Sequence, residues 1–96
     1  MTRLRRIETQ NRFFFVTTNL REGVTPLSSA EYSLILAVLA QQQSRGQFFL
    51  FGYVVMPTHV HLLLYPRHSD LSRIMRDFKS RTGYEIAQAR GIRGPI

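Results

Sequence analysis

The sequence VVMPTHVHLLL at residues 54–64 decides the expected fold, because it places a turn signal between two strongly apolar runs. The run at residues 48–55 and the run at residues 59–65 are rich in the aromatic and branched side chains that are typical of strands. Proline cannot donate a hydrogen bond to a sheet, so the Met-Pro-Thr tripeptide between the runs belongs in a turn. Two strands joined this closely form an antiparallel hairpin.

Two histidines stand two positions apart at the start of the second of these strands. Side chains at positions i and i+2 leave a strand on the same face, so His59 and His61 are expected to lie side by side, with Val60 pointing into the core. A pair of neutral imidazoles can bind one divalent metal ion. The alternative is two solvent-facing histidines that bond only to water or to the backbone.

A strand and a helix are expected before the hairpin. Residues 13–18 are aromatic and β-branched and predict the strand. Ser28 or Ser29 begins the helix, since Glu31 follows Ser28 at capping-box spacing, and the helix is expected to end near residue 45. Its predicted buried face consists of Tyr32, Ile35, Leu36, Leu39 and Ala40.

A second helix is expected after the hairpin. Ser, Asp, Leu and Ser at residues 69–72 provide its cap. Apolar positions recur at helical spacing behind this cap, and they predict a buried stripe formed by Leu71, Ile74, Met75, Phe78, Thr82 and Ile86.

The element order is therefore strand, helix, strand, strand, helix. The helical crossover makes the first two strands parallel, either adjacent or with one strand between them. This predicts an α+β, ferredoxin-like layout of the β-α-β-β-α type, with the final strand missing. We expect a basic N-terminal arm over residues 1–11, a domain over residues 12–90 and a loop tail over residues 91–96.

Composition predicts a polyanionic partner. The 96 residues carry a net charge of +7, and twelve of the thirteen basic residues are arginine. Arginine binds phosphates in a bidentate manner and stacks on bases, although a genome that favours arginine would give the same skew. The absence of cysteine excludes disulfides, a thiolate nucleophile and a thiolate zinc site. With no apolar run of membrane-spanning length, we expect a cytoplasmic protein without a membrane partner.

A family resemblance adds to these observations. The sequence VMPTHVHLL at residues 55–63 is similar to the segment with the HUH motif (His, hydrophobic residue, His) in REP-associated and insertion-sequence single-tyrosine transposases. The similarity extends in order to RRI at residues 5–7, FFVTT at residues 14–18 and LSRIMRDFKS at residues 71–80. Thr58 stands where the family usually has asparagine.

The resemblance implies a nuclease domain that binds single-stranded or hairpin DNA. His59 and His61 would hold Mg²⁺ or Mn²⁺ against the scissile phosphate, and a tyrosine would attack to form a 5′-phosphotyrosine. The implied DNA-backbone contacts are Arg3, Arg5, Arg6, Arg73, Arg76, Lys79 and Arg81.

The resemblance departs from the family pattern at the C-terminus. The family continues with a strand beginning Trp-Gln and then with the tyrosine helix, whereas this sequence ends at Ile96. Tyr84 aligns with a variable position of the second helix and not with the nucleophile. We therefore expect a truncated copy with impaired cleavage.

Two further interpretations remain open at this stage. One is a non-catalytic, DNA-binding regulatory module derived from such an enzyme. The other is a small structural homodimer with an incidental basic surface, in which the free edge of an incomplete sheet pairs with a second chain.

Overall fold

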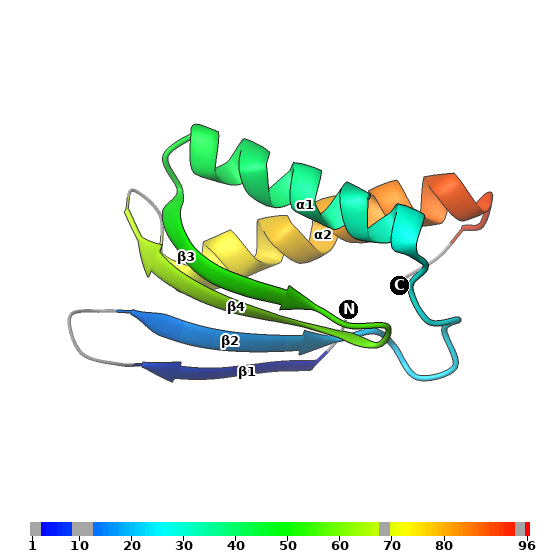
Figure 1. The fold of residues 1–96 in the computed structure, drawn as a ribbon, viewed down its shortest axis with the longest axis horizontal. Coiled ribbons are helices and arrows are strands. Elements are labelled where there is room, and N and C mark those ends of the chain that lie inside the picture. The colour runs from blue at the N-terminus through cyan, green and yellow to red at the C-terminus, as the bar shows by residue number, and fades with distance from the viewer. Residues whose placement is uncertain (1–2, 9–12, 68–69, 94–95) are drawn as a thin grey trace.

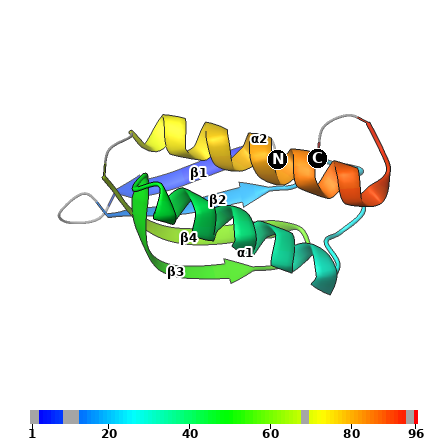
Figure 2. The ribbon, with the colours of Figure 1, turned by 90° about the horizontal axis from the view of Figure 1, so that it is seen from above.

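The computed structural model describes residues 3–8, 13–67, 70–93 and 96, with side chains described from Phe13 onward. Within these ranges the chain forms a four-stranded sheet whose one face is covered by two helices (Figures 1 and 2). The elements in chain order are β1 (Arg3–Glu8), β2 (Phe14–Asn19), α1 (Ser29–Ser44), β3 (Phe48–Val55), β4 (His59–Pro66) and α2 (Leu71–Arg90).

The sheet has the order β1-β2-β4-β3, and all its pairings are antiparallel. Because β2 and β3 both pair with β4, they run parallel to each other with one strand between them, as the helical crossover allowed. The β3–β4 hairpin was also predicted correctly. The α+β, ferredoxin-like fold class is confirmed.

The N-terminal segment differs from its prediction. Arg3–Glu8 is not an arm outside the sheet but an edge strand that pairs with β2 from Arg3↔Asn19 to Glu8↔Phe14. The sheet therefore has four strands, the number in a complete β-α-β-β-α-β layout. The fourth strand is β1, which precedes the others in the chain instead of following α2. The sequence Arg-Leu-Arg-Arg-Ile-Glu lacks the alternation that signals a strand, so only the pairing with β2 defines it.

The two faces of the sheet have different environments. Val60, Leu62 and Leu64 of β4 are buried against the helices, and they alternate with half-buried residues on the side away from the helices. We call this second side the open face; its described residues on the three strands with described side chains include Phe15, Thr17, Phe49, Val54, His59, His61, Leu63 and Tyr65.

The helices were predicted with different accuracy. All six residues predicted for the stripe of α2 are buried. For α1 the bounds and the Ser28–Glu31 capping box are as expected, but the predicted face is wrong in part. The buried residues of α1 are Glu31, Ile35, Val38, Leu39 and Gln42, whereas Tyr32 and Leu36 are half-buried and Ala40 is exposed. Apolar side chains surround the middle of this helix, so their spacing does not define one face.

An ion pair joins the start of α1 to the end of α2. Arg90 binds Glu31 through both carboxylate oxygens, at 2.7 Å from Nε and 2.8 Å from Nη2, and also donates to the Pro26 carbonyl at 3.1 Å. The Ser28 backbone N–H donates to Glu31 Oε1 at 2.9 Å. Arg90, followed by the Ser28 bonds, lowers the pKa of Glu31 to about 2 although burial opposes this shift. The pair holds the two helices in a fixed relation over the sheet.

Candidate metal and nucleic-acid site

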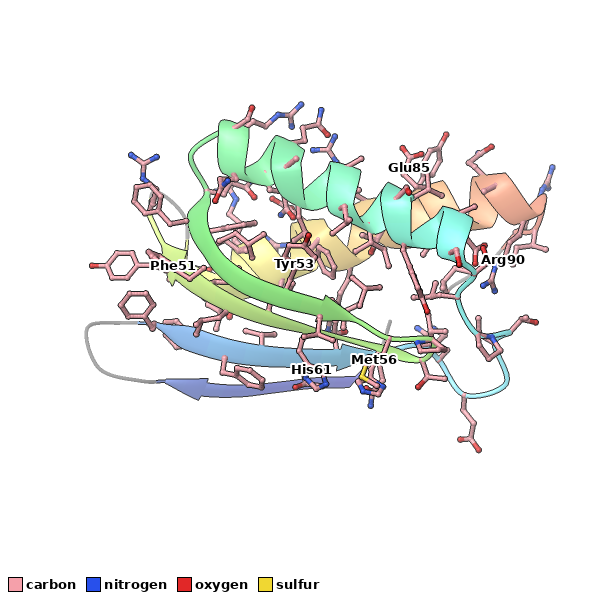
Figure 3. The ribbon with its side chains drawn as sticks, viewed as in Figure 1. Phe51, Tyr53, Met56, His61, Glu85 and Arg90 are labelled. Atoms are coloured by element: carbon pink, nitrogen blue, oxygen red, sulfur yellow. The ribbon has the colours of Figure 1, made fainter. Side chains whose placement is uncertain are left out.

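The histidine pair lies on the open face at the start of β4. Figure 3 shows His61 on the side of the sheet away from both helices. The His59 and His61 ring centroids are 4.8 Å apart, and the ring planes are inclined by 85°. Val60 between them is fully buried, which confirms its predicted place in the core. Because β4 is paired on both sides, the strand that carries the histidines is fixed in the middle of the sheet.

The turn before the histidines is also fixed. The Met56 N–H donates to the His59 carbonyl at 2.8 Å, which closes the hairpin. The loop after β2 holds the turn from outside, since the Leu20 N–H donates to the Thr58 carbonyl at 2.9 Å and the Leu27 N–H donates to the Pro57 carbonyl at 2.7 Å. The backbone that carries the histidines is therefore held in place on both sides of the turn.

Threonine hydroxyls orient both rings. His61 Nδ1 is hydrogen-bonded to Thr17 Oγ1 at 2.9 Å, and His59 Nδ1 is hydrogen-bonded to Thr58 Oγ1 at 3.1 Å. A ring that donates its Nδ1–H to the threonine oxygen leaves Nε2 as the nitrogen that can bind a ligand. A bond from the second ring nitrogen to an oxygen is the usual way in which proteins orient a metal-binding histidine. Thr17 lies on β2 and becomes a neighbour only through strand pairing, so sequence reasoning did not find it.

The donor set fits a metal ion with open coordination positions. Within the described ranges, no group of three or more His, Cys, Asp and Glu side chains could hold a metal ion, so the histidine pair alone could offer at most two ligands. Hydrated divalent ions in phosphate-processing sites commonly keep several waters and take phosphate oxygens as further ligands. The pair can therefore hold a metal ion and still leave positions for a phosphodiester.

The predicted DNA-contacting residues of α2 lie on the other side of the sheet. Arg73 and Arg76 are exposed, and Lys79 and Arg81 are half-buried, on a helix that packs against the face opposite the histidines. The side chains of Arg3, Arg5 and Arg6 on β1 lie outside the described part of the structure. The structure therefore does not bring the α2 cations and the histidines into one site.

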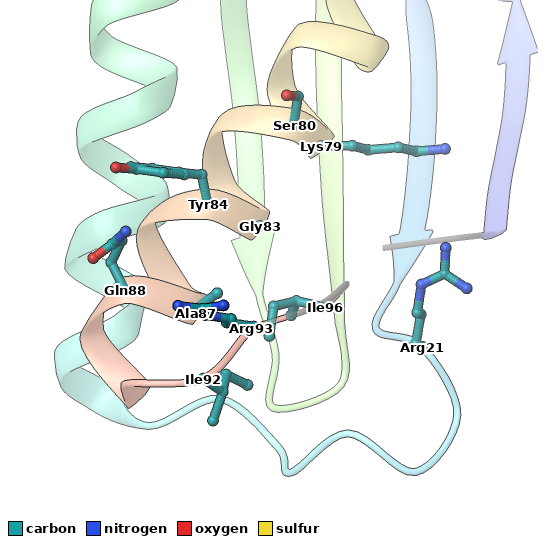
Figure 4. Close-up of a pocket in the computed structure, with 10 residues that line it drawn as sticks. All are labelled: Arg21, Lys79, Ser80, Gly83, Tyr84, Ala87, Gln88, Ile92, Arg93 and Ile96. Carbon is teal, nitrogen blue, oxygen red and sulfur yellow. The ribbon is translucent and has the colours of Figure 1, made fainter.

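A second basic cluster was not predicted. Arg21, Lys79 and Arg93 line a cavity of about 500 Å³ between α2, the loop after β2 and the C-terminal segment (Figure 4). No acidic residue lines this cavity, and among the described residues none of the three cations forms an ion pair. The Arg21 N–H donates to the carbonyl of the buried Ile96 at 2.7 Å, which joins the loop to the C-terminal segment. Arg21 and Arg93 lie in segments without a periodic pattern, so no sequence signal indicated that both would line this cavity.

Comparison with known proteins identifies the family. The model of the family described as "Transposase IS200 like" matches residues 9–92. The chain belongs to the IS200-like transposase family. A solved structure of a REP-associated tyrosine transposase bound to a REP hairpin is similar to this chain, with a TM-score of 0.66 and 24% sequence identity. The match covers 97% of this chain and 55% of that one, and at this identity it supports the fold alone. A comparison with curated proteins gave no match.

No described tyrosine of this transposase-family domain stands beside the histidine pair on the open face. Tyr65 shares the open face but stands four residues beyond His61, about 13 Å along the strand, with its ring 5.1 Å from that of Phe13. Tyr84 is 62% exposed on α2 and lines the cavity on the helix side of the sheet (Figure 4). Tyr53 is in register with the helix-facing Leu62, and Tyr32 lies on α1.

Neither helix of the described chain is long and apolar enough to span a bilayer.

Proposed function

We propose that this domain binds single-stranded or hairpin DNA and holds Mg²⁺ or Mn²⁺ at His59 and His61, facing a DNA phosphate. The observation that carries the proposal is the pair of imidazoles 4.8 Å apart on the open face, each with its Nδ1 bonded to a threonine hydroxyl. Rings that donate Nδ1–H to these hydroxyls have Nε2 free to bind a metal, and both side chains leave the same face of β4.

The metal would polarise the phosphoryl oxygen and stabilise negative charge that develops on it. The protein's part is to hold both rings in a fixed orientation, which the Thr17 and Thr58 hydroxyls support. Nitrogen ligands suit Mn²⁺ better than Mg²⁺, which prefers oxygen. We therefore expect Mn²⁺ to bind this pair more tightly than Mg²⁺.

The basic surface on the helix side would hold the DNA backbone. Two exposed cations of α2, Arg73 and Arg76, belong to this surface. So does the cavity lined by Arg21, Lys79 and Arg93, whose lining contains no acidic residue. Guanidinium groups bind phosphate oxygens in a bidentate manner. Arg81 and the arginines of β1, namely Arg3, Arg5 and Arg6, remain proposed backbone contacts. A DNA segment that reached both regions would pass around the edge of the sheet.

The proposed reaction is strand cleavage through a phosphotyrosine intermediate. The tyrosine Oη would attack phosphorus, an O–P bond would form, and the 3′-oxygen would leave with its electron pair and take up a proton as a free 3′-hydroxyl. Tyr53 lines the same hollow as His61 but is in register with the helix-facing Leu62, and Tyr84 lies on α2, on the far side of the sheet. This observation favours a second candidate function, a DNA-binding module that does not cleave by itself.

Metal and DNA binding can be measured separately to test the proposal. Mn²⁺ binding is followed by electron paramagnetic resonance, and binding of single-stranded and hairpin oligonucleotides is followed by fluorescence anisotropy at several salt concentrations. We expect His59→Ala with His61→Ala to abolish Mn²⁺ binding with the fold intact. Arg73→Glu with Arg76→Glu should weaken DNA binding and leave Mn²⁺ binding unchanged.

The two candidate functions give different results in this experiment. A covalent protein–DNA product that requires Mn²⁺ and the histidines supports cleavage. DNA affinity that is insensitive to the histidine variant, with no covalent product, supports the non-cleaving module. A protein that binds neither Mn²⁺ nor DNA at low salt would refute both candidates, and a dimer without nucleic-acid affinity would support the purely structural alternative.

A further inference from the structure

A hollow on the open face adjoins the histidine pair. It has a volume of about 420 Å³, and its lining, which is mostly apolar, includes Phe15, Gly52, Val54, His61 and Leu63. Because Gly52 stands opposite Leu63 in the β3–β4 pairing and has no side chain, the hollow is open above the sheet. The volume falls within the range of roughly 300–1,000 Å³ that is usual for small-ligand sites.

Phe15 is an unusual side chain for this position. It lies on β2, which is paired on both sides, yet 43% of its surface is exposed, and Val54 across the hollow is 54% exposed. The Phe15 ring is stacked on His61, with centroids 5.7 Å apart and planes inclined by 29°. The exposed part of this ring therefore presents an apolar surface to solvent beside the histidine pair.

We infer that an unpaired nucleobase occupies the hollow and stacks on Phe15 when the DNA phosphate is bound at the histidines. This inference rests on the proposed function. His61 belongs both to the histidine pair and to the lining of the hollow, so a phosphate held there places its own nucleoside beside Phe15. A flat aromatic surface accepts the face of any base, as in other proteins that bind single strands.

The rest of the open face is consistent with this occupant. Beyond the hollow, the Phe13 ring lies 4.9 Å from Phe51 and 5.1 Å from Tyr65, and Phe51 lies 6.4 Å from Phe49. The Arg67 guanidinium stands 4.4 Å above the Phe49 ring. Aromatic rings combined with a cation are the usual components of a single-strand binding surface.

Charge favours a nucleic acid over a second copy of the chain. Each chain carries a net charge of +7, so two copies repel each other, whereas a DNA strand is attracted. No acidic residue lines the hollow, so nothing in it would repel a strand.

The test compares strands with and without bases. Anisotropy is measured with an oligothymidylate and with an abasic strand of equal length, on the wild type and on Phe15→Ala. Stacking on one aromatic ring contributes roughly a five- to hundredfold gain in affinity. We expect Phe15→Ala to lose about that factor for the oligothymidylate and almost nothing for the abasic strand, while Phe15→Tyr retains wild-type affinity.

A second variant closes the hollow without removing the ring. A Cβ atom added to Gly52 meets only the Leu63 Cβ, at an ordinary contact distance of 3.9 Å. Because residue 52 lines the hollow, we expect the side chain of Gly52→Leu to occupy it. We expect Gly52→Leu to reproduce the Phe15→Ala defect with Mn²⁺ binding unchanged. Thermal unfolding followed by circular dichroism confirms that each variant is folded.

A direct readout uses oligothymidylates that carry 2-aminopurine, whose emission falls when the base stacks. Quenching by the wild type and by Phe15→Tyr, but not by Phe15→Ala, is expected. Equal quenching and equal affinity across these proteins would overturn the inference and leave the proposed function intact. If the wild type bound no DNA at all, the proposed function would instead be refuted. A further outcome is that the wild type self-associates and that Phe15→Ala abolishes this self-association without changing DNA affinity. That outcome would assign the hollow to a second copy of the chain and overturn the inference.

Discussion

The Glu31–Arg90 pair predicts a specific loss of stability in acid. The pKa of Glu31 lies at about 2 in the fold instead of 4.5, and each pKa unit corresponds to 1.36 kcal/mol. The carboxylate therefore stabilises the folded state by about 3 kcal/mol when it is charged. Both side chains are largely buried, with 10% of the Glu31 side chain and 16% of the Arg90 side chain exposed.

The sign of the pH dependence follows from the lowered pKa. This stabilisation is fully present above the unfolded-state value of 4.5, and it is lost as pH falls through the folded-state value of about 2. Glu31→Gln keeps an oxygen that can accept from the Ser28 N–H but removes the charge facing Arg90. At neutral pH the free energy of unfolding of the variant should be about 3 kcal/mol lower than that of the wild type, which corresponds to a Tm roughly 10–25 °C lower.

Urea denaturation followed by circular dichroism, between neutral pH and about pH 2, measures this effect. The difference between wild type and Glu31→Gln should shrink steadily below about pH 4.5. Glu85→Gln, which removes an exposed carboxylate of α2, is the matched control and should change stability by less than about 0.5 kcal/mol. A difference that stayed constant down to about pH 2 would refute the assignment of the stabilisation to the charged pair.

Three further outcomes are expected. Thr17→Val removes the hydroxyl at His61 Nδ1 and should weaken Mn²⁺ binding roughly 10- to 100-fold in a titration followed by electron paramagnetic resonance, with the free energy of unfolding unchanged. Arg21→Ala with Lys79→Ala should lower the slope of log affinity for DNA against log salt by about two, provided that both side chains contact phosphates. Phe78→Ala empties a fully buried position of α2 and should cost about 3–5 kcal/mol in urea denaturation.

The sequence predicted the fold correctly where apolar and polar residues alternate clearly within a single helix or strand. In α2, the buried stripe from Leu71 to Ile86 stands among charged residues, so its spacing was unambiguous. In β4, strict alternation placed Val60 in the core and both histidines on the opposite face.

The remaining features depend on contacts between distant segments. In α1, Glu31 and Gln42 are buried because Arg90 and the Ile74 carbonyl bind them, and these partners lie 59 and 32 residues away in the chain. The strand β1 and the Thr17–His61 bond likewise exist only through pairing with β2 and β4. Local patterns contain no information about such partners.

The open face has a consequence for how this domain can change over generations. The helices cover only one side of the sheet, so Val60, Leu62 and Leu64 carry the packing of β4 while His59, His61 and Leu63 are largely excluded from it. Substitutions among the outward residues would therefore alter ligand preference with little penalty in folding. A lineage could change what the open face binds while every inward residue stayed the same.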